Sequence, residues 1–155
     1  EFIALDAARF APLHALDDAG LRAQHARRLS CTESPGMPCR VSLEDAVPGE
    51  TVLLLNHLHP DTDSPYRASG PIYVRAAAGP GFGRRSEVPV MLRSRLLSLR
   101  AYDARGFLRQ AEVVEGSVIE SGLAAAFASS KVDYVHIHFA RPGCYACTVR
   151  RVGAD

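Results

Sequence analysis

The chain has 155 residues, a length typical of one domain, and we expect residues 1–155 to fold as a single domain. Hydrophobic residues make up 47% and charged residues 23%, a globular composition that argues against long disordered stretches. The formal net charge is +1, whereas proteins that bind nucleic acid or membrane surfaces usually carry a basic excess, so we expect neither kind of partner. No apolar run approaches the ~20 residues that span a bilayer and no signal peptide is visible, which predicts a cytoplasmic protein.

The first half of the chain predicts one helix and three strands. The helix is expected at residues 17–28, because Asp17 is a suitable N-cap and the arginines lie at the C-terminal end, where the helix dipole favours them. Breakers such as Pro38 predict irregular structure over residues 29–41. The strands are expected at residues 2–5, 51–58 and 71–75, and the second is an apolar run typical of a buried strand.

The second half predicts two hairpins and two helices. Residues 76–86 are rich in Gly and Pro and are expected to form a mobile surface loop that can act as a lid. A short helix is expected at residues 88–94 and a longer one at 117–130, where Ser117 and Glu120 have the spacing of a capping box. The hairpins are expected to pair 96–103 with 107–115 and 132–139 with 144–152.

These elements predict an α+β fold. Its sheet is expected to be antiparallel or mixed, with two hairpins in the C-terminal half of the chain and two to three helices. The four cysteines are expected to be free thiols, because a chain of this size needs no disulfides to hold its core.

The last hairpin carries the first candidate site. Residues two apart in a strand share a face, so Tyr134, His136 and His138 are expected on one face of their strand. A connecting loop of two or four residues places Cys147 on the same face of the hairpin. An odd loop or a β-bulge moves Cys147 away and brings Cys144 instead.

Histidines beside a cysteine suggest three interpretations. In the first, His136 and His138 are general acids or bases and a cysteine, Cys144 or Cys39, is the nucleophile. In the second, His136, His138 and Cys147 bind a metal such as zinc. In the third, the histidines are bonded within a polar sheet face, the cysteine is a small core residue and the protein has no cofactor.

A second His-x-His pair, His57 and His59, ends the buried strand and leads into a polar loop. This loop contains serine hydroxyls, Arg67 and the backbone N–H groups near Gly70, all of which are suited to hold an anion. The alternative is an ordered surface loop whose aspartates and serines form turns. Whether this loop lies beside the C-terminal hairpin is left open.

Four segments of the chain resemble the bacterial domain of unknown function family 1203. They are PGMPCRVSLEDAVPGE (35–50), LLLNHLHPDTDSPYRASGPIYVR (53–75), LLSLRAYDARG (96–106) and HIHFARPGCYA (136–146). The resemblance implies a single-domain bacterial protein and supplies no established activity. The residues that match the characteristic segments are Cys39, Arg40, Ser64, Tyr66, Arg67, Gly70, Arg75, Arg100, Tyr102, His136, His138, Gly143 and Cys144.

The hypothesis that these patterns favour is an enzyme or binding protein for a small anionic metabolite. Its carboxylate or phosphate would be held in a pocket by a polar set, which comprises Arg40, Ser64, Tyr66, Arg67, Arg75 and Arg100. The alternative for the arginines is solvation or pairing with Glu44, Asp45 or Asp103. The alternatives for the function are a metal-binding domain and a non-catalytic interaction module, which would expose an apolar patch. The substrate and the oligomeric state are not predicted.

Overall fold

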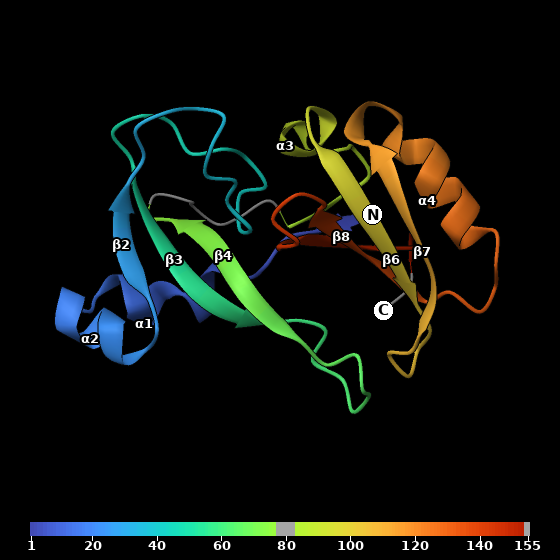
Figure 1. Cartoon of the computed structure of the whole chain (residues 1–155), viewed down its shortest axis with the longest axis horizontal. Helices are drawn as coiled ribbons and strands as arrows, with labels where there is room; N and C mark the ends of the chain where they lie inside the picture. The colour runs from blue at the N-terminus through green and yellow to red at the C-terminus, as the bar shows by residue number, and fades with distance from the viewer. Residues whose placement is uncertain (77–82, 154–155) are drawn as a thin grey trace.

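The structure, a computed structural model, describes residues 1–76 and 83–153, which form two antiparallel β-sheets (Figure 1). The smaller sheet has the strand order β2-β3-β4, with β2 at Arg27–Ser30, β3 at Thr51–Leu58 and β4 at Ser69–Arg75. The larger sheet has the order β5-β1-β9-β8-β6-β7. Its strands are β1 (Phe2–Ile3), β5 (Arg84–Arg85), β6 (Leu96–Tyr102), β7 (Leu108–Glu115), β8 (Tyr134–Phe139) and β9 (Tyr145–Arg150).

The helices are short and pack beside the sheets. They are η1 (Ala7–Arg9), α1 (Ala11–His14), α2 (Asp18–Ala23), α3 (Val90–Arg93), η2 (Gly116–Val118) and α4 (Ile119–Phe127). Figure 1 shows α1 and α2 with the smaller sheet, and α4 on the outer side of the larger sheet, beside β6 and β7. Within residues 1–76 and 83–153, no helix has both the length and the apolar character that a membrane crossing requires.

The α+β class and the antiparallel pairing agree with the sequence prediction, although the strands form two sheets instead of one. Both predicted hairpins are present as β6–β7 and β8–β9, and all four cysteines are free thiols. The predicted mobile loop at 76–86 lies largely outside the described residues.

Two predicted helix features are wrong. The helix expected at 17–28 ends at Ala23, because His25 adopts a left-handed backbone (φ 53°) and the arginines that follow join β2, which pairs with β3. The capping box expected at Ser117 is also missing. The long helix begins at Ile119 without a side-chain cap, and Glu120 forms an ion pair with Arg93 instead.

The larger sheet has one apolar and one polar face because its side chains alternate. On the apolar face, Leu97, Leu99, Val135 and Ile137 form a core with Leu123 of α4. The polar face lies toward the smaller sheet and carries Arg100, Tyr102, Tyr134, His136 and His138. The smaller sheet packs its own core against the N-terminal helices. The polar groups that can support chemistry therefore lie between the two sheets.

Candidate functional site

The two His-x-His pairs meet between the sheets, which the sequence left open. The ring of His59, which follows β3, lies 5.2 Å from that of His138 and 6.5 Å from that of His136, measured between centroids. His136 and His138 lie side by side on β8, with centroids 6.3 Å apart. His57 stacks on His59 at 5.8 Å, and Tyr145 of β9 contacts all four imidazole rings. All four histidines are buried.

Two of these histidines are held in a defined tautomer by the backbone. The Nδ1 of His59 lies 3.0 Å from the carbonyl oxygen of His57, and the Nδ1 of His138 lies 2.9 Å from that of Gly143. A carbonyl only accepts, so each Nδ1 carries the proton and donates it. The Nε2 of each ring is therefore left with a free lone pair.

Burial makes these imidazoles neutral. Desolvation, assisted by neighbouring histidines and by Arg100, lowers the pKa of both His136 and His138 to about 3. The pKa of His57 is lowered to about 4, again mainly by burial. The cluster thus presents unprotonated nitrogen atoms at neutral pH.

Cys147 does not belong to this cluster, because the hairpin contains the β-bulge that was the predicted alternative to a Cys147 on the histidine face. A β-bulge between Ile137 and His138 shifts the register, so that Cys147 pairs with Ile137 and Tyr145 pairs with His138. Cys147 is consequently buried in the apolar core on the opposite face of the sheet. Burial also raises the pKa of its thiol to about 12, which keeps the sulfur protonated.

Arg40 is the most unusual charged residue of the structure. Only 2% of its surface is exposed, and no carboxylate among the described residues lies within ion-pair distance of its guanidinium. Its Nε donates to the carbonyl oxygen of Tyr145 at 2.7 Å and its Nη1 to that of Pro38, while Nη2 has no hydrogen-bond partner among the described residues. Burial lowers the pKa of Arg40 to about 10. A buried charge without a counter-ion is costly, so this arrangement calls for an explanation.

Arg40 lines a cavity of about 710 Å³ between the segment before it and the β8–β9 hairpin. Its guanidinium lies 5.1 Å from the ring centroid of Phe139, and the Arg95 guanidinium lies 5.2 Å from the same ring. Arg95 is neutralised by Asp45 through two hydrogen bonds of 2.6 and 2.8 Å. The remaining lining comprises Gly36, Pro38, Leu54, Pro71, Tyr73, Ser94, Leu96, Glu115, Arg141, Pro142 and Cys144.

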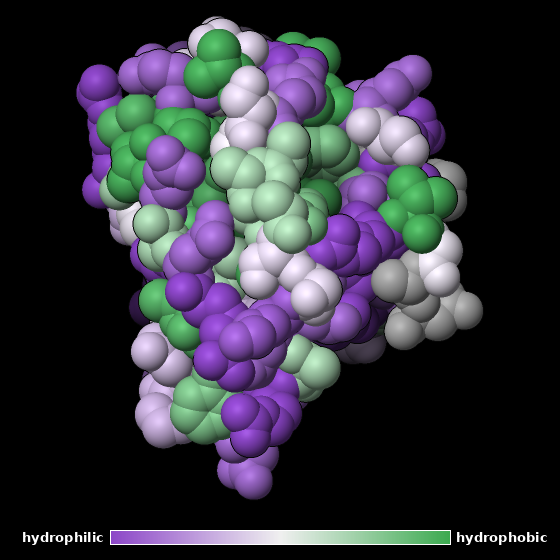
Figure 2. Space-filling view, turned by 90° about the vertical axis from the view of Figure 1, so that its right-hand side faces the viewer, coloured by the Kyte–Doolittle hydropathy of each residue, from purple (hydrophilic) through white to green (hydrophobic). Residues whose placement is uncertain are grey.

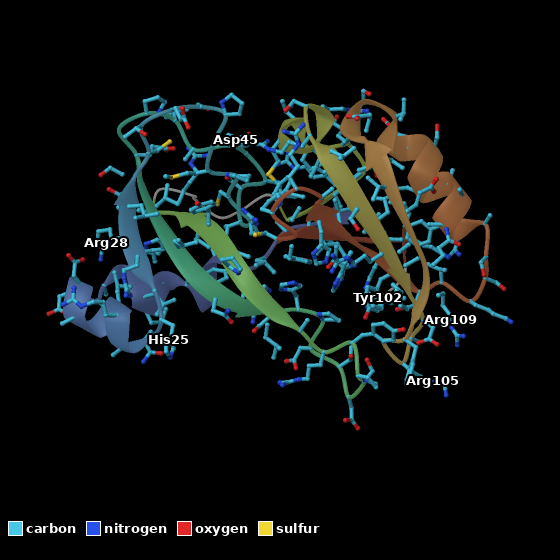
Figure 3. The ribbon with its side chains drawn as sticks, viewed as in Figure 1. His25, Arg28, Asp45, Tyr102, Arg105 and Arg109 are labelled. Atoms are coloured by element: carbon cyan, nitrogen blue, oxygen red, sulfur yellow. The ribbon has the colours of Figure 1, made fainter. Side chains whose placement is uncertain are left out.

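The cavity and the histidine cluster are separate sites that share Tyr145. The main-chain carbonyl of Tyr145 accepts from Arg40, whereas its ring stacks on His59 at 4.9 Å. In Figure 3, Asp45, the partner of Arg95, lies at the upper end of the space between the sheets, and Tyr102, which contacts His136, lies at the lower end. No histidine lines the cavity among the described residues, so the expected pairing of Arg40 and Cys144 with His136 or His138 in one pocket does not occur.

The other predicted cysteine nucleophile, Cys39, is fully buried. Its Sγ accepts backbone N–H groups from Val41, Ser42 and Arg75 at 3.3–3.5 Å. These contacts tie the 39–42 turn to the end of β4. Cys39 therefore has a structural role, because its sulfur accepts hydrogen bonds from two backbone segments. Cys144, in contrast, is partly exposed and lines the cavity.

The remaining predicted binding residues are dispersed. Arg75 pairs with Glu44 at 3.0 Å and Glu50 at 2.6 Å, and Arg67 pairs with Asp61 at 3.2 Å on the surface. Ser64 donates to the carbonyl oxygen of Gly106, and the Tyr66 ring packs against Tyr102, so both dock their loop onto the β6–β7 turn. Arg100 lies in the histidine cluster, opposite His136. Sequence reasoning missed Arg95, Phe139 and Arg141 in the cavity, although Arg141 lies in the RPGCYA segment that carries the resemblance.

An interaction module would expose a contiguous apolar patch. Figure 2 shows the side of the molecule that carries α4, where hydrophobic and hydrophilic residues are interspersed. The large apolar side chains exposed among the described residues are distributed over separate loops, helices and strands. They are Val47, Tyr66, Val90, Phe107, Val113, Val118 and Val152.

Fold and site together define an α+β domain with two antiparallel sheets, a buried arginine at a cavity and a histidine cluster between the sheets. The model of the family described as a protein of unknown function (DUF1203) matches residues 36–151, so the chain belongs to this family. This match confirms the resemblance seen in the sequence. Searches of curated proteins and of solved structures found no match.

Proposed function

We propose that this domain binds a small organic anion, a carboxylate or a phosphate ester, in the cavity lined by Arg40. The observation that carries the proposal is the Arg40 guanidinium, which is buried without a carboxylate partner among the described residues. An anion in the cavity would supply the missing counter-charge, and the free Nη2 would donate to it. Charge-assisted hydrogen bonds of this kind are among the strongest that proteins use for recognition.

The lining supports an anion with an apolar body. Phe139, Tyr73, Leu54 and the prolines offer apolar contacts, and a cavity of about 710 Å³ is within the range of small-molecule sites. Arg141 and Glu115 are both exposed at the cavity and offset one another in charge, and Arg95 is neutralised by Asp45, so the uncompensated charge of the described lining is that of Arg40. A second hollow of about 780 Å³ lies on the smaller sheet, but its basic residues, Arg22, His25 and Arg27, are solvent-exposed and need no counter-ion.

The test is a thermal-shift panel in a buffer without phosphate or sulfate, covering inorganic phosphate, phosphate monoesters and aliphatic and aromatic carboxylates. A ligand at 100 times its Kd stabilises the fold by about 2.7 kcal/mol. For a chain of this size, 1 kcal/mol raises Tm by about 2–4 °C, so a shift of about 5–10 °C is expected.

The variant Arg40→Met should lose this shift. Arg67→Met, which removes a surface arginine paired with Asp61 and absent from the cavity lining, should keep it. Equal shifts in wild type and Arg40→Met, or no shift with any member of the panel, would overturn the proposal. The relative response to phosphates and carboxylates distinguishes the two ligand chemistries.

A further inference from the structure

Three imidazoles, two on β8 and one directly after β3, lie close to one another without any hydrogen bond between them. We propose that His59, His136 and His138 bind a divalent transition-metal ion such as Zn²⁺. Imidazole nitrogen is a preferred ligand of zinc and of copper, iron and nickel. This site is separate from the Arg40 cavity, and its existence does not depend on the proposed anion binding.

The ring spacings are close to those of a shared metal ion. Two imidazoles bound to one tetrahedral zinc ion, each with Zn–N of about 2.0–2.1 Å, have ring centroids about 5 Å apart. The His59–His138 pair, at 5.2 Å, has this spacing, whereas His136 is at 6.3 and 6.5 Å from the other two. Accordingly, among the described residues no three His, Cys, Asp or Glu side chains already have the arrangement of a complete metal site. Binding requires the His136 ring to move by about 1 Å toward its neighbours.

The His136 ring is held by packing and not by hydrogen bonds to the described residues. No hydrogen bond joins either ring nitrogen of His136 to a described residue, and its Nδ1 is buried without a partner. A small rotation therefore breaks no polar contact. Its neighbours Tyr134 and Tyr102 contact it only through their rings, at 4.9 and 5.4 Å.

His59 and His138 are prepared as ligands. Metal-bound histidines almost always donate their second N–H to a carbonyl or carboxylate, which fixes the tautomer and aims the other nitrogen at the metal. His59 and His138 do this through the carbonyls of His57 and Gly143. The Nε2 of His138, a residue with 1% exposure, is buried without any partner in the described structure. An ion bound there would satisfy an atom whose isolation is otherwise unfavourable.

The surroundings indicate what completes the site. Three neutral imidazoles leave the double charge of the ion uncompensated, and Arg100 lies beside His136 without a carboxylate partner among the described residues. Tyr145 already engages its hydroxyl with Thr148 Oγ1 at 2.8 Å. The fourth position is therefore left to water or to an anionic ligand, as in zinc sites with three protein ligands.

The test begins with the chelator-treated protein, titrated with Zn²⁺ by calorimetry and with Co²⁺ by visible absorption. We expect one equivalent to bind and Co²⁺ to develop the visible bands of low-coordinate cobalt. Loss of a group hydrogen-bonded to a ligand costs about 10–100-fold in affinity, so His138→Gln and His59→Gln should each weaken binding by at least that factor.

The matched control is His25→Asn. His25 is exposed, lines the second hollow and lies beside α2, at the edge of the smaller sheet that is remote from the larger sheet (Figure 3). Asparagine tolerates its left-handed backbone. This variant and Arg40→Met should both bind metal with the affinity of the wild type. Unchanged metal binding in Arg40→Met would show that the metal site does not depend on anion binding at Arg40. If a ligand variant does not fold, long-range ¹⁵N–¹H spectra of the wild type decide, because Zn²⁺ should shift the ring nitrogens of three of the six histidines. No bound equivalent, or unchanged affinity in folded His138→Gln, would overturn the proposal.

Discussion

Arg40 and Arg95 offer a matched pair of substitutions that measures what a missing counter-ion costs a buried arginine. Both guanidinium groups lie on the Phe139 ring, at 5.1 and 5.2 Å, and both line the same cavity. They differ in their counter-ions, because Arg95 is paired with Asp45 and Arg40 has no carboxylate partner among the described residues. Substitution by methionine should therefore lower the free energy of unfolding by different amounts at the two positions.

For Arg40→Met, two effects on the free energy of unfolding oppose each other. Lowering the pKa from 12.5 to about 10 corresponds to about 3 kcal/mol of unfavourable charge burial, which the substitution relieves. Against this, the carbonyls of Tyr145 and Pro38 each lose a charge-assisted hydrogen bond of about 1.5–3 kcal/mol. The two lost bonds together outweigh the relieved charge burial by about 0–3 kcal/mol, so we expect the free energy of unfolding to fall by no more than about 3 kcal/mol.

For Arg95→Met, the carboxylate of Asp45, 14% exposed, loses its partner. Breaking a fully buried ion pair from one side costs about 3–5 kcal/mol. Because the Arg95 side chain is 19% exposed, the loss should approach this range and exceed that of Arg40→Met. Urea unfolding followed by far-UV circular dichroism measures both values, since the chain has no tryptophan. If Arg40→Met were as destabilised as Arg95→Met, Arg40 would be a structural cross-link and the argument from its missing counter-ion would fail.

Other substitutions test the packing and the electrostatics. Gly116→Ala would place a Cβ 1.8 Å from the carbonyl oxygen of Leu92, so we expect it to lower Tm strongly or prevent folding; unchanged thermal unfolding would contradict this contact. Cys147→Ser should cost about 1–3 kcal/mol in urea unfolding, because it buries a hydroxyl in an apolar core; a neutral result would place Cys147 elsewhere. The pKa of Asp103 is held below its usual 3.8, first by the hydrogen bond from the N–H of Phe107. The ionised carboxylate therefore stabilises the fold fully above pH 3.8, and this stabilisation is lost as the pH falls through the lower pKa of the folded state. Asp103→Asn should reduce the pH dependence of stability below 3.8, and an unaltered acid-unfolding profile would refute it.

Local patterns predicted the elements whose partners are close in the sequence. The β6–β7 and β8–β9 hairpins follow from alternation and from the glycines at their turns, Gly106 and Gly143, which both have φ near +75°. The prediction placed Arg27 and Arg28 of β2 in a helix and Leu29 and Ser30 in an irregular segment, because the pairing of these residues with β3 is not visible in the sequence.

Which residues form the site depends on a β-bulge, on the packing of the two sheets and on the ion pairs, none of which the residue pattern of one strand contains. Because side chains alternate with period two, the one-residue bulge at Ile137/His138 was enough to remove Cys147 from the histidine face. The meeting of His59 with His138 depends on how two sheets pack, which neither His-x-His motif encodes alone. Similarly, the sequence shows many arginines and acids, and only the structure shows that Asp45 pairs with Arg95 and leaves Arg40 alone.

The most direct test of anion binding at Arg40 uses Cys144 as a reporter in the cavity. Of the four cysteines, all within the described residues, Cys144 is partly exposed and the other three are buried, so iodoacetamide should alkylate Cys144 first. Peptide mass spectrometry gives the alkylation rate with and without a saturating anion from the panel. If the anion binds at Arg40, it should slow alkylation several-fold in wild type and have no effect in Arg40→Met. An unchanged rate in wild type, or equal protection in Arg40→Met, would contradict this binding.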